Sequence, residues 1–219
     1  MPEAARRAKR TWLFIAEAGA AAMGMCLFGV FVHSQPPLVL LSGVGLCATA
    51  IAIWHFFRTE AFPATTLGLS RPTRALALYA ILGCLIGLGL GVAYREVRHW
   101  GPFPDALRRF VFVAAAIGAT EELLFRGYIQ GRVRRLGVVG AVLFAAICHT
   151  AYKCALRALP PIGVDTDFRF LATWTFVGGV VFGALRERSR SVLPPLAAHV
   201  VFDLIVYGHQ AQAPCWVWS

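Results

Sequence analysis

The sequence has 219 residues, of which 58% are hydrophobic and only 15% are charged. Soluble domains carry about 25% charged residues, and here the charges lie in short clusters between long apolar stretches, so the composition predicts a helical membrane protein and excludes an ordinary soluble domain. The continuous apolar runs also argue against a transmembrane β-barrel. The net charge is +10, and the basic residues flank the apolar runs. This placement indicates contacts with lipid headgroups and a role in membrane topology, and no nucleic-acid partner.

Seven stretches are apolar and long enough to be candidate membrane-spanning helices of one domain, residues 1–219. In chain order they are Trp12–Val32, Pro37–Phe57, Ala75–Tyr94, Phe110–Gln130, Leu136–Tyr152, Phe168–Leu185 and Val192–Gly208. The basic residues before the first stretch are typical of a signal peptide, but the apolar run that follows is too long for one, so we predict a retained first helix. Between the second and third stretches, residues 62–72 predict a polar linker with a short interfacial helix.

Positive residues are distributed unequally over the connecting segments. With the N-terminus in the cytoplasm, the cytoplasmic segments hold 13 of the 21 basic residues and the outer segments hold seven. The cytoplasmic set is Arg6, Arg7, Lys9, Arg10, Arg58, Arg71, Arg74, Arg132, Arg134, Arg135, Arg186, Arg188 and Arg190, and the outer set is Arg95, Arg98, Arg108, Arg109, Lys153, Arg157 and Arg169. This bias predicts a cytoplasmic N-terminus and an outer C-terminus, and we place the protein in the inner membrane of a bacterial cell.

The basic connection between residues 95 and 109 fits this arrangement least well. An additional re-entrant or interfacial helix in this connection would raise the number of helices to eight. We therefore predict an all-α transmembrane bundle of seven to eight helices.

Three of the predicted spans carry ionisable side chains. The fourth contains Glu121, Glu122 and Arg126, the fifth contains His149, and the last contains His199 and Asp203. An ionisable group within a span costs about 3 kcal/mol on insertion scales, so these groups are expected to face a polar interior and one another. For the isolated Glu17 and His55 we expect only a bond to a neighbouring helix or a position near a membrane interface.

Helical spacing divides these residues into pairs. Glu122 and Arg126 are four positions apart, so they lie on one helix face and are expected to form an ion pair. Glu121 points about 100° away and stays available as a general base. His199 and Asp203 are also four apart, which predicts that the carboxylate holds one ring nitrogen and leaves the other for a ligand.

The order of these motifs resembles that of the CAAX protease and bacteriocin-processing family, whose members are intramembrane endopeptidases and include the type II CAAX prenyl endopeptidases. The segment Glu121-Glu122-Leu123-Leu124-Phe125-Arg126-Gly127-Tyr128 and the Leu193-Pro194-Pro195 ahead of His199 are similar to family members over about residues 110–208, the expected catalytic core. One position departs from the family. Its second motif usually has phenylalanine four residues before the histidine, where this chain has Ala145, with Phe144 one position earlier, so we expect a different wall around His149.

The resemblance implies hydrolysis of a peptide bond in a membrane-associated substrate that is prenylated or carries a leader peptide. Glu121 with His149 would activate a water molecule, and His199 with Asp203 would stabilise the oxyanion. The residues that would shape and charge-balance the site are Glu122 and Arg126. The expected partners are membrane lipids and a membrane-associated peptide or protein.

A metal-dependent version of the same site is the first alternative. Glu121, His149 and His199 could bind a catalytic zinc ion with an open fourth position, as in a metalloprotease. The chain lacks the H-E-x-x-H signature and thiolate ligands at this site, so we favour a glutamate-dependent reaction without a cofactor.

Two further alternatives use the same residues without proteolysis. Intramembrane acids and histidines also serve transporters and proton relays, although the sequence shows no repeat symmetry or broken helices. The departure at Ala145 would also fit a non-catalytic scaffold or immunity-type protein of the same fold.

Overall fold

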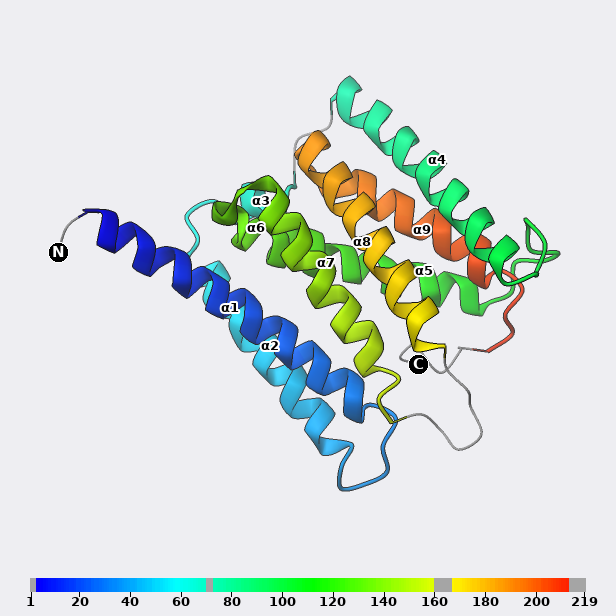
Figure 1. Ribbon diagram of the computed structural model, residues 1–219, viewed down its shortest axis with the longest axis horizontal. Coiled ribbons are helices and arrows are strands. Elements are labelled where there is room, and N and C mark those ends of the chain that lie inside the picture. Colours follow the sequence, from blue (N-terminus) through cyan, green and yellow to red (C-terminus); the bar gives the residue numbers. More distant parts are fainter. Residues whose placement is uncertain (1–2, 70–72, 160–166, 213–219) are drawn as a thin grey trace.

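The computed structural model describes residues 3–69, 73–159 and 167–212, and within these ranges the chain forms helices and turns with no strand (Figure 1). The helices are α1 (Glu3–Phe31), α2 (Leu40–Thr59), α3 (Pro63–Leu67), α4 (Arg74–Val97), α5 (Phe110–Glu122), α6 (Gln130–Arg132), α7 (Gly137–Ala155), α8 (Phe168–Ser189) and α9 (Leu193–Tyr207). A π-helical turn, Leu123–Ile129, joins α5 to α6, and a 3-10 turn, Arg134–Leu136, precedes α7. The predicted all-α class is confirmed.

Each of the seven predicted spans contains a helix, and five of these helices are long and apolar enough to cross a membrane: α1, α2, α4, α7 with its preceding turn, and α8. The protein is therefore an integral membrane protein. The other two predicted spans fall short for different reasons. The α9 helix has only 15 residues, and α5 has 13 residues before the charged π-helical turn continues it to α6.

The linker between α2 and α4 contains the predicted short helix. Gly68 ends α3 with a φ angle of +74°, a left-handed conformation that glycine adopts without strain. The last residues of the predicted linker, Ser70, Arg71 and Pro72, lie outside the described residues, as does part of the predicted basic N-terminus, residues 1–2, and the side chains of residues 3–10.

The connection between α4 and α5 contains turns and no helix over residues 98–109, so the additional helix considered for this connection is absent there. The cause is Arg95, whose side chain is buried at the end of α4. Its guanidinium donates hydrogen bonds to the carbonyl oxygens of Trp100, Gly101 and Phe103, at 2.9, 2.8 and 3.0 Å. The connection wraps around this cation because its carbonyl groups satisfy the buried N–H donors.

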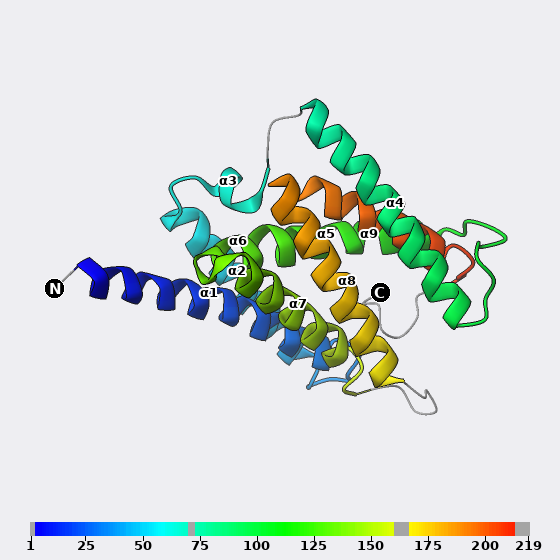
Figure 2. The same ribbon diagram turned by 45° about the horizontal axis from the view of Figure 1, so that its top comes forward.

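The helices pack in two groups around α7 and α8. In Figures 1 and 2 the α1–α2 hairpin lies beside α7, α4 and α9 run side by side, and α5 crosses behind α8. Glycine permits the close approach of α4 to α9, because a Cβ atom on Gly83 or Gly87 would overlap the backbone of Pro194 or Ala198.

A polar cluster links the α1–α2 hairpin to α6. The Glu17 carboxylate accepts hydrogen bonds from Arg132 at 2.7 Å and Tyr128 at 3.1 Å, and it lies 3.2 Å from the ring of His55. Arg132 also pairs with Glu60 at 2.7 Å. The prediction that Glu17 and His55 bond neighbouring helices is confirmed. Arg132, predicted only as a loop charge, is buried and holds three helical segments together.

Candidate active site

The acidic pair ends α5 at the point where the backbone changes from an α-helix to a π-helix. Glu121 and Glu122 are both buried, and the π-helical turn carries Phe125 and Arg126 to positions with no exposed surface. A π-helical turn interrupts the regular hydrogen-bond ladder and is frequent at functional sites. Here it brings a ring and a guanidinium to the same buried face as the two carboxylates.

Arg126 connects the acidic pair to His149 on α7. Its Nη1 lies 2.9 Å from Glu122 Oε1, so the predicted ion pair is confirmed, and 2.9 Å from His149 Nδ1. A guanidinium only donates hydrogen bonds, so Nδ1 accepts and the ring proton is assigned to Nε2. Nε2 then donates to Glu121 Oε2 at 3.2 Å. His149 is therefore held from both sides by α5 and the turn that follows it.

His199 on α9 is oriented by Glu122 and not by Asp203. Its Nδ1 donates to Glu122 Oε1 at 2.8 Å, whereas its Nε2 lies 3.8 Å from Asp203 Oδ1. The prediction that Asp203 holds the ring is wrong, because 3.8 Å is too long for a hydrogen bond and the carboxylate of α5 reaches the ring from the neighbouring helix. Nε2 also lies 4.0 Å from Glu121 Oε2, a separation that one water molecule can bridge.

A small polar cavity lies where these groups meet. It has a volume of about 20 Å³ and is lined by Gly118, Glu121, Lys153, Asp203 and Tyr207 with two apolar residues of α5. This volume is sufficient for one water molecule. Of the six predicted site residues, Glu121 and Asp203 line it, and His149 and His199 lie within 4.0 Å of Glu121. Glu122 and Arg126 contact these two histidines from outside the cavity.

Lys153 belongs to this site, and the sequence prediction missed it. Its Nζ forms an ion pair with Glu121 Oε1 at 2.5 Å, and its side chain is only 14% exposed. Glu121, which we expect to act as a general base, therefore has a charged partner that the sequence analysis did not assign to it. The charge pattern predicts Lys153 as an outer loop residue, but it follows His149 by four positions, so helical spacing places both on the same face of α7.

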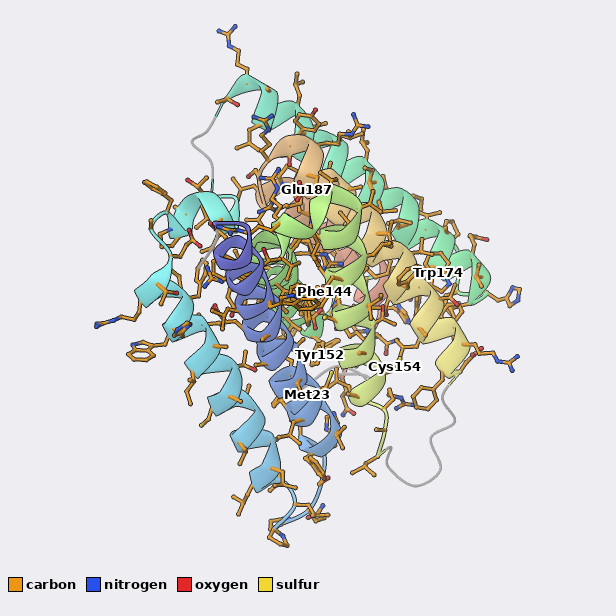
Figure 3. The ribbon with its side chains drawn as sticks, turned by 60° about the vertical axis from the view of Figure 1, so that its left-hand side comes forward. Met23, Phe144, Tyr152, Cys154, Trp174 and Glu187 are labelled. Atoms are coloured by element: carbon orange, nitrogen blue, oxygen red, sulfur yellow. The ribbon has the colours of Figure 1, made fainter. Side chains whose placement is uncertain are left out.

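A larger apolar cavity, the aromatic slot, adjoins these residues. It has a volume of about 80 Å³, and its lining includes Tyr94, Trp174, Phe182, Phe202 and Tyr207 together with Arg126, His149 and Lys153. Trp174 lies between α8 and α4 in Figure 3, where it packs edge-on against Tyr94. Arg126 Nε and Nη2 are buried without a hydrogen-bond partner in the described part of the chain. The slot thus combines apolar walls with unused donors.

The aromatic wall of His149 is built by the π-helical turn and not by the residue four positions before it. Ala145 is buried, and Phe144 lies between α7 and α1, where it packs against the core cluster that contains Tyr152 (Figure 3). The ring that stacks on His149 comes from Phe125, with ring centroids 4.5 Å apart and planes inclined by 24°. The π-helical turn therefore supplies an aromatic contact to the histidine.

The observed arrangement does not fit the alternative zinc site of Glu121, His149 and His199. Zinc needs a free nitrogen lone pair on each histidine, but the two nitrogens of His149 are occupied by Arg126 and Glu121. Among the described residues no group of three or more His, Cys, Asp or Glu side chains is arranged to hold a metal ion.

Comparison with known proteins gives one family. Residues 103–205 match the family described as type II CAAX prenyl endopeptidase Rce1-like. The match covers just under half of the chain and contains the six predicted site residues and Lys153, whereas Tyr94 and Tyr207 lie outside it. No curated protein and no solved structure matches the chain.

Proposed function

Because this chain belongs to the type II CAAX prenyl endopeptidase Rce1-like family, a family of membrane proteases, we propose that it hydrolyses a peptide bond in a membrane-associated peptide or protein. The observation that carries the proposal is the convergence of Glu121, His149 and His199 beside a polar cavity with room for one water molecule. A prenylated substrate and a leader-peptide substrate both fit this reaction. The family match favours proteolysis over transport and over a non-catalytic scaffold.

The proposed reaction begins with Glu121 as the general base. Its carboxylate accepts a proton from the cavity water, and the water oxygen attacks the peptide carbonyl carbon. His149 holds the carboxylate in place through its Nε2–H. His199, in its protonated form, donates from Nε2 to the oxyanion while Glu122 holds its Nδ1. The proton on Glu121 then moves to the amide nitrogen, the C–N bond breaks, and a carboxylic acid and an amine leave.

We assign the aromatic slot to an apolar group of the substrate. Its walls are aromatic, and it adjoins the polar cavity at Lys153 and Tyr207, which line both spaces. The unused N–H groups of Arg126 are suited to a backbone carbonyl of the bound peptide.

Gly118→Ala tests whether the polar cavity is the reaction site. An added Cβ atom would contact Asp203 and lie 2.9 Å from His199 Cδ2, so these movable side-chain ends must shift. We expect kcat/KM for a membrane-bound peptide to fall about 100-fold, because a displacement near 1 Å has this cost. Gly19→Ala, where the new Cβ meets nothing within 4 Å, is the control. Equal kcat/KM for Gly118→Ala and wild type would contradict the assignment.

We propose that the reaction needs no metal, since Arg126 and Glu121 occupy both nitrogens of His149. Exhaustive chelation of the purified protein should leave its peptidase rate unchanged. Stoichiometric zinc whose removal abolishes cleavage, and whose return restores it, would overturn this part of the proposal.

We also propose that the N-terminus faces the cytoplasm of a bacterial cell. The exposed side chains of Arg58 and Arg188 lie in the last turns of α2 and α8, and those of Arg134 and Arg135 lie in the 3-10 turn after α6; these segments lie toward the upper left of the molecule in Figure 1. A membrane-impermeant thiol reagent should not label a cysteine placed at Arg188 in intact cells; labelling there before lysis would contradict this orientation.

A further inference from the structure

Lys153 is placed where a reacting carbonyl group would meet it. It borders both the polar cavity and the aromatic slot, one helical turn beyond His149 on α7. An ammonium group has three N–H donors. One bonds Glu121 Oε1, and no other hydrogen-bond acceptor for Nζ is found among the described residues. Two donors are therefore available to a ligand that enters from the slot.

The other groups at the polar cavity supply no permanently charged donor. An ionised Asp203 only accepts hydrogen bonds, and His199 donates from Nε2 only when its ring is protonated. Arg126 lines the slot and does not line the polar cavity. Tyr207 contributes a neutral hydroxyl group. Lys153 is thus the cationic side chain among the residues that line the polar cavity.

We propose that Lys153 is a catalytic residue that donates a charged hydrogen bond to the oxyanion, an inference that rests on the proposed peptidase function. As the water oxygen bonds to the carbonyl carbon, Glu121 takes the water proton and the carbonyl π electrons move onto oxygen, where the ammonium donates. When the C–N bond breaks, those electrons re-form the carbonyl group and the proton on Glu121 moves to the amide nitrogen. Lys153 keeps its own proton throughout.

The first measurement compares Lys153→Ala with wild type on a membrane-bound peptide. Removing one oxyanion donor costs about 10²–10³ in kcat, and KM should change little because the donor acts on the transition state. Lys153→Gln keeps a neutral N–H donor toward Glu121 and should give an intermediate kcat. It also preserves the test if the alanine variant does not fold.

Chemical rescue separates this role from a structural one. Methylammonium added to Lys153→Ala restores N–H donors in the vacated space, so kcat should rise with its concentration. Tetramethylammonium carries the same charge without an N–H group and should give no rescue. Rescue by both ions alike, or by neither, would overturn the proposed hydrogen bond and leave Lys153 as a residue that only balances the charge of Glu121.

The outcomes also separate this inference from the proposed function. A Glu121→Gln variant with wild-type turnover would contradict the proposed peptidase mechanism itself. If Glu121→Gln is inactive but Lys153→Ala has wild-type kcat, the proposed peptidase mechanism is supported. The same pair of results contradicts the proposed role of Lys153.

Discussion

Replacing Glu121 by glutamine should lower kcat for peptide hydrolysis by about 10²–10⁴-fold, the range for loss of a general base. Glutamine has nearly the same size and can still accept the hydrogen bond that His149 donates at 3.2 Å. It cannot take a proton from water. The measurement is the rate of fragment formation from a peptide anchored in micelles or vesicles, with enzyme concentration matched by quantitative staining.

Glu96→Gln is the matched control for this substitution. Glu96 lies on α4 with an exposed side chain, so the same chemical change there should leave kcat unaltered. A folded Glu121→Gln protein that cleaves at the rate of Glu96→Gln would exclude Glu121 as the base.

Arg126→Met should give the largest loss of stability. The ion pair between Arg126 and Glu122 has no solvent exposure on either side chain. Removing one partner of a buried pair costs about 3–5 kcal/mol, because the other charge is left buried and uncompensated. His149 would also lose the donor at its Nδ1. Thermal unfolding in detergent micelles should therefore shift to markedly lower temperature.

A double variant isolates the charge effect in this prediction. Glu122→Gln/Arg126→Met removes both charges, so it should unfold at a higher temperature than Arg126→Met alone. Arg188→Met, at an exposed position of α8, should match wild type. A double variant that loses the sum of both single effects would show that the pair contributes nothing as a pair.

The helices and the local pairs were accessible from sequence because they depend on short-range periodicity. The apolar runs predicted helices that the structure confirms, and the spacing of Glu122 and Arg126 predicted their ion pair. The same rule could have found Lys153, four positions after His149. The charge pattern favours a loop position for Lys153 because a lysine near the end of an apolar run resembles a loop charge.

The spacing of residues along one helix does not predict contacts between different helices. The bond from His199 to Glu122 joins residues 77 positions apart, and local spacing pointed to Asp203 instead. The stacking of Phe125 on His149 depends on a π-helical turn that has no periodic signature. The hydrogen bonds from the buried Arg95 side chain to backbone carbonyl oxygens likewise form only when the connection folds back on α4. Each is a tertiary contact that overrides the local pattern.

The central claim is that the Glu121 carboxylate of α5, held by His149 of α7, activates a water molecule that attacks the peptide directly. Single-turnover cleavage in H₂¹⁸O tests this claim, with mass spectrometry of both the peptide product and the enzyme fragment that contains Glu121. Direct attack predicts one ¹⁸O atom in the new carboxylate of the product and none in Glu121. An unlabelled product with ¹⁸O in the Glu121 carboxylate would show that the glutamate itself attacks the peptide, and would contradict the account.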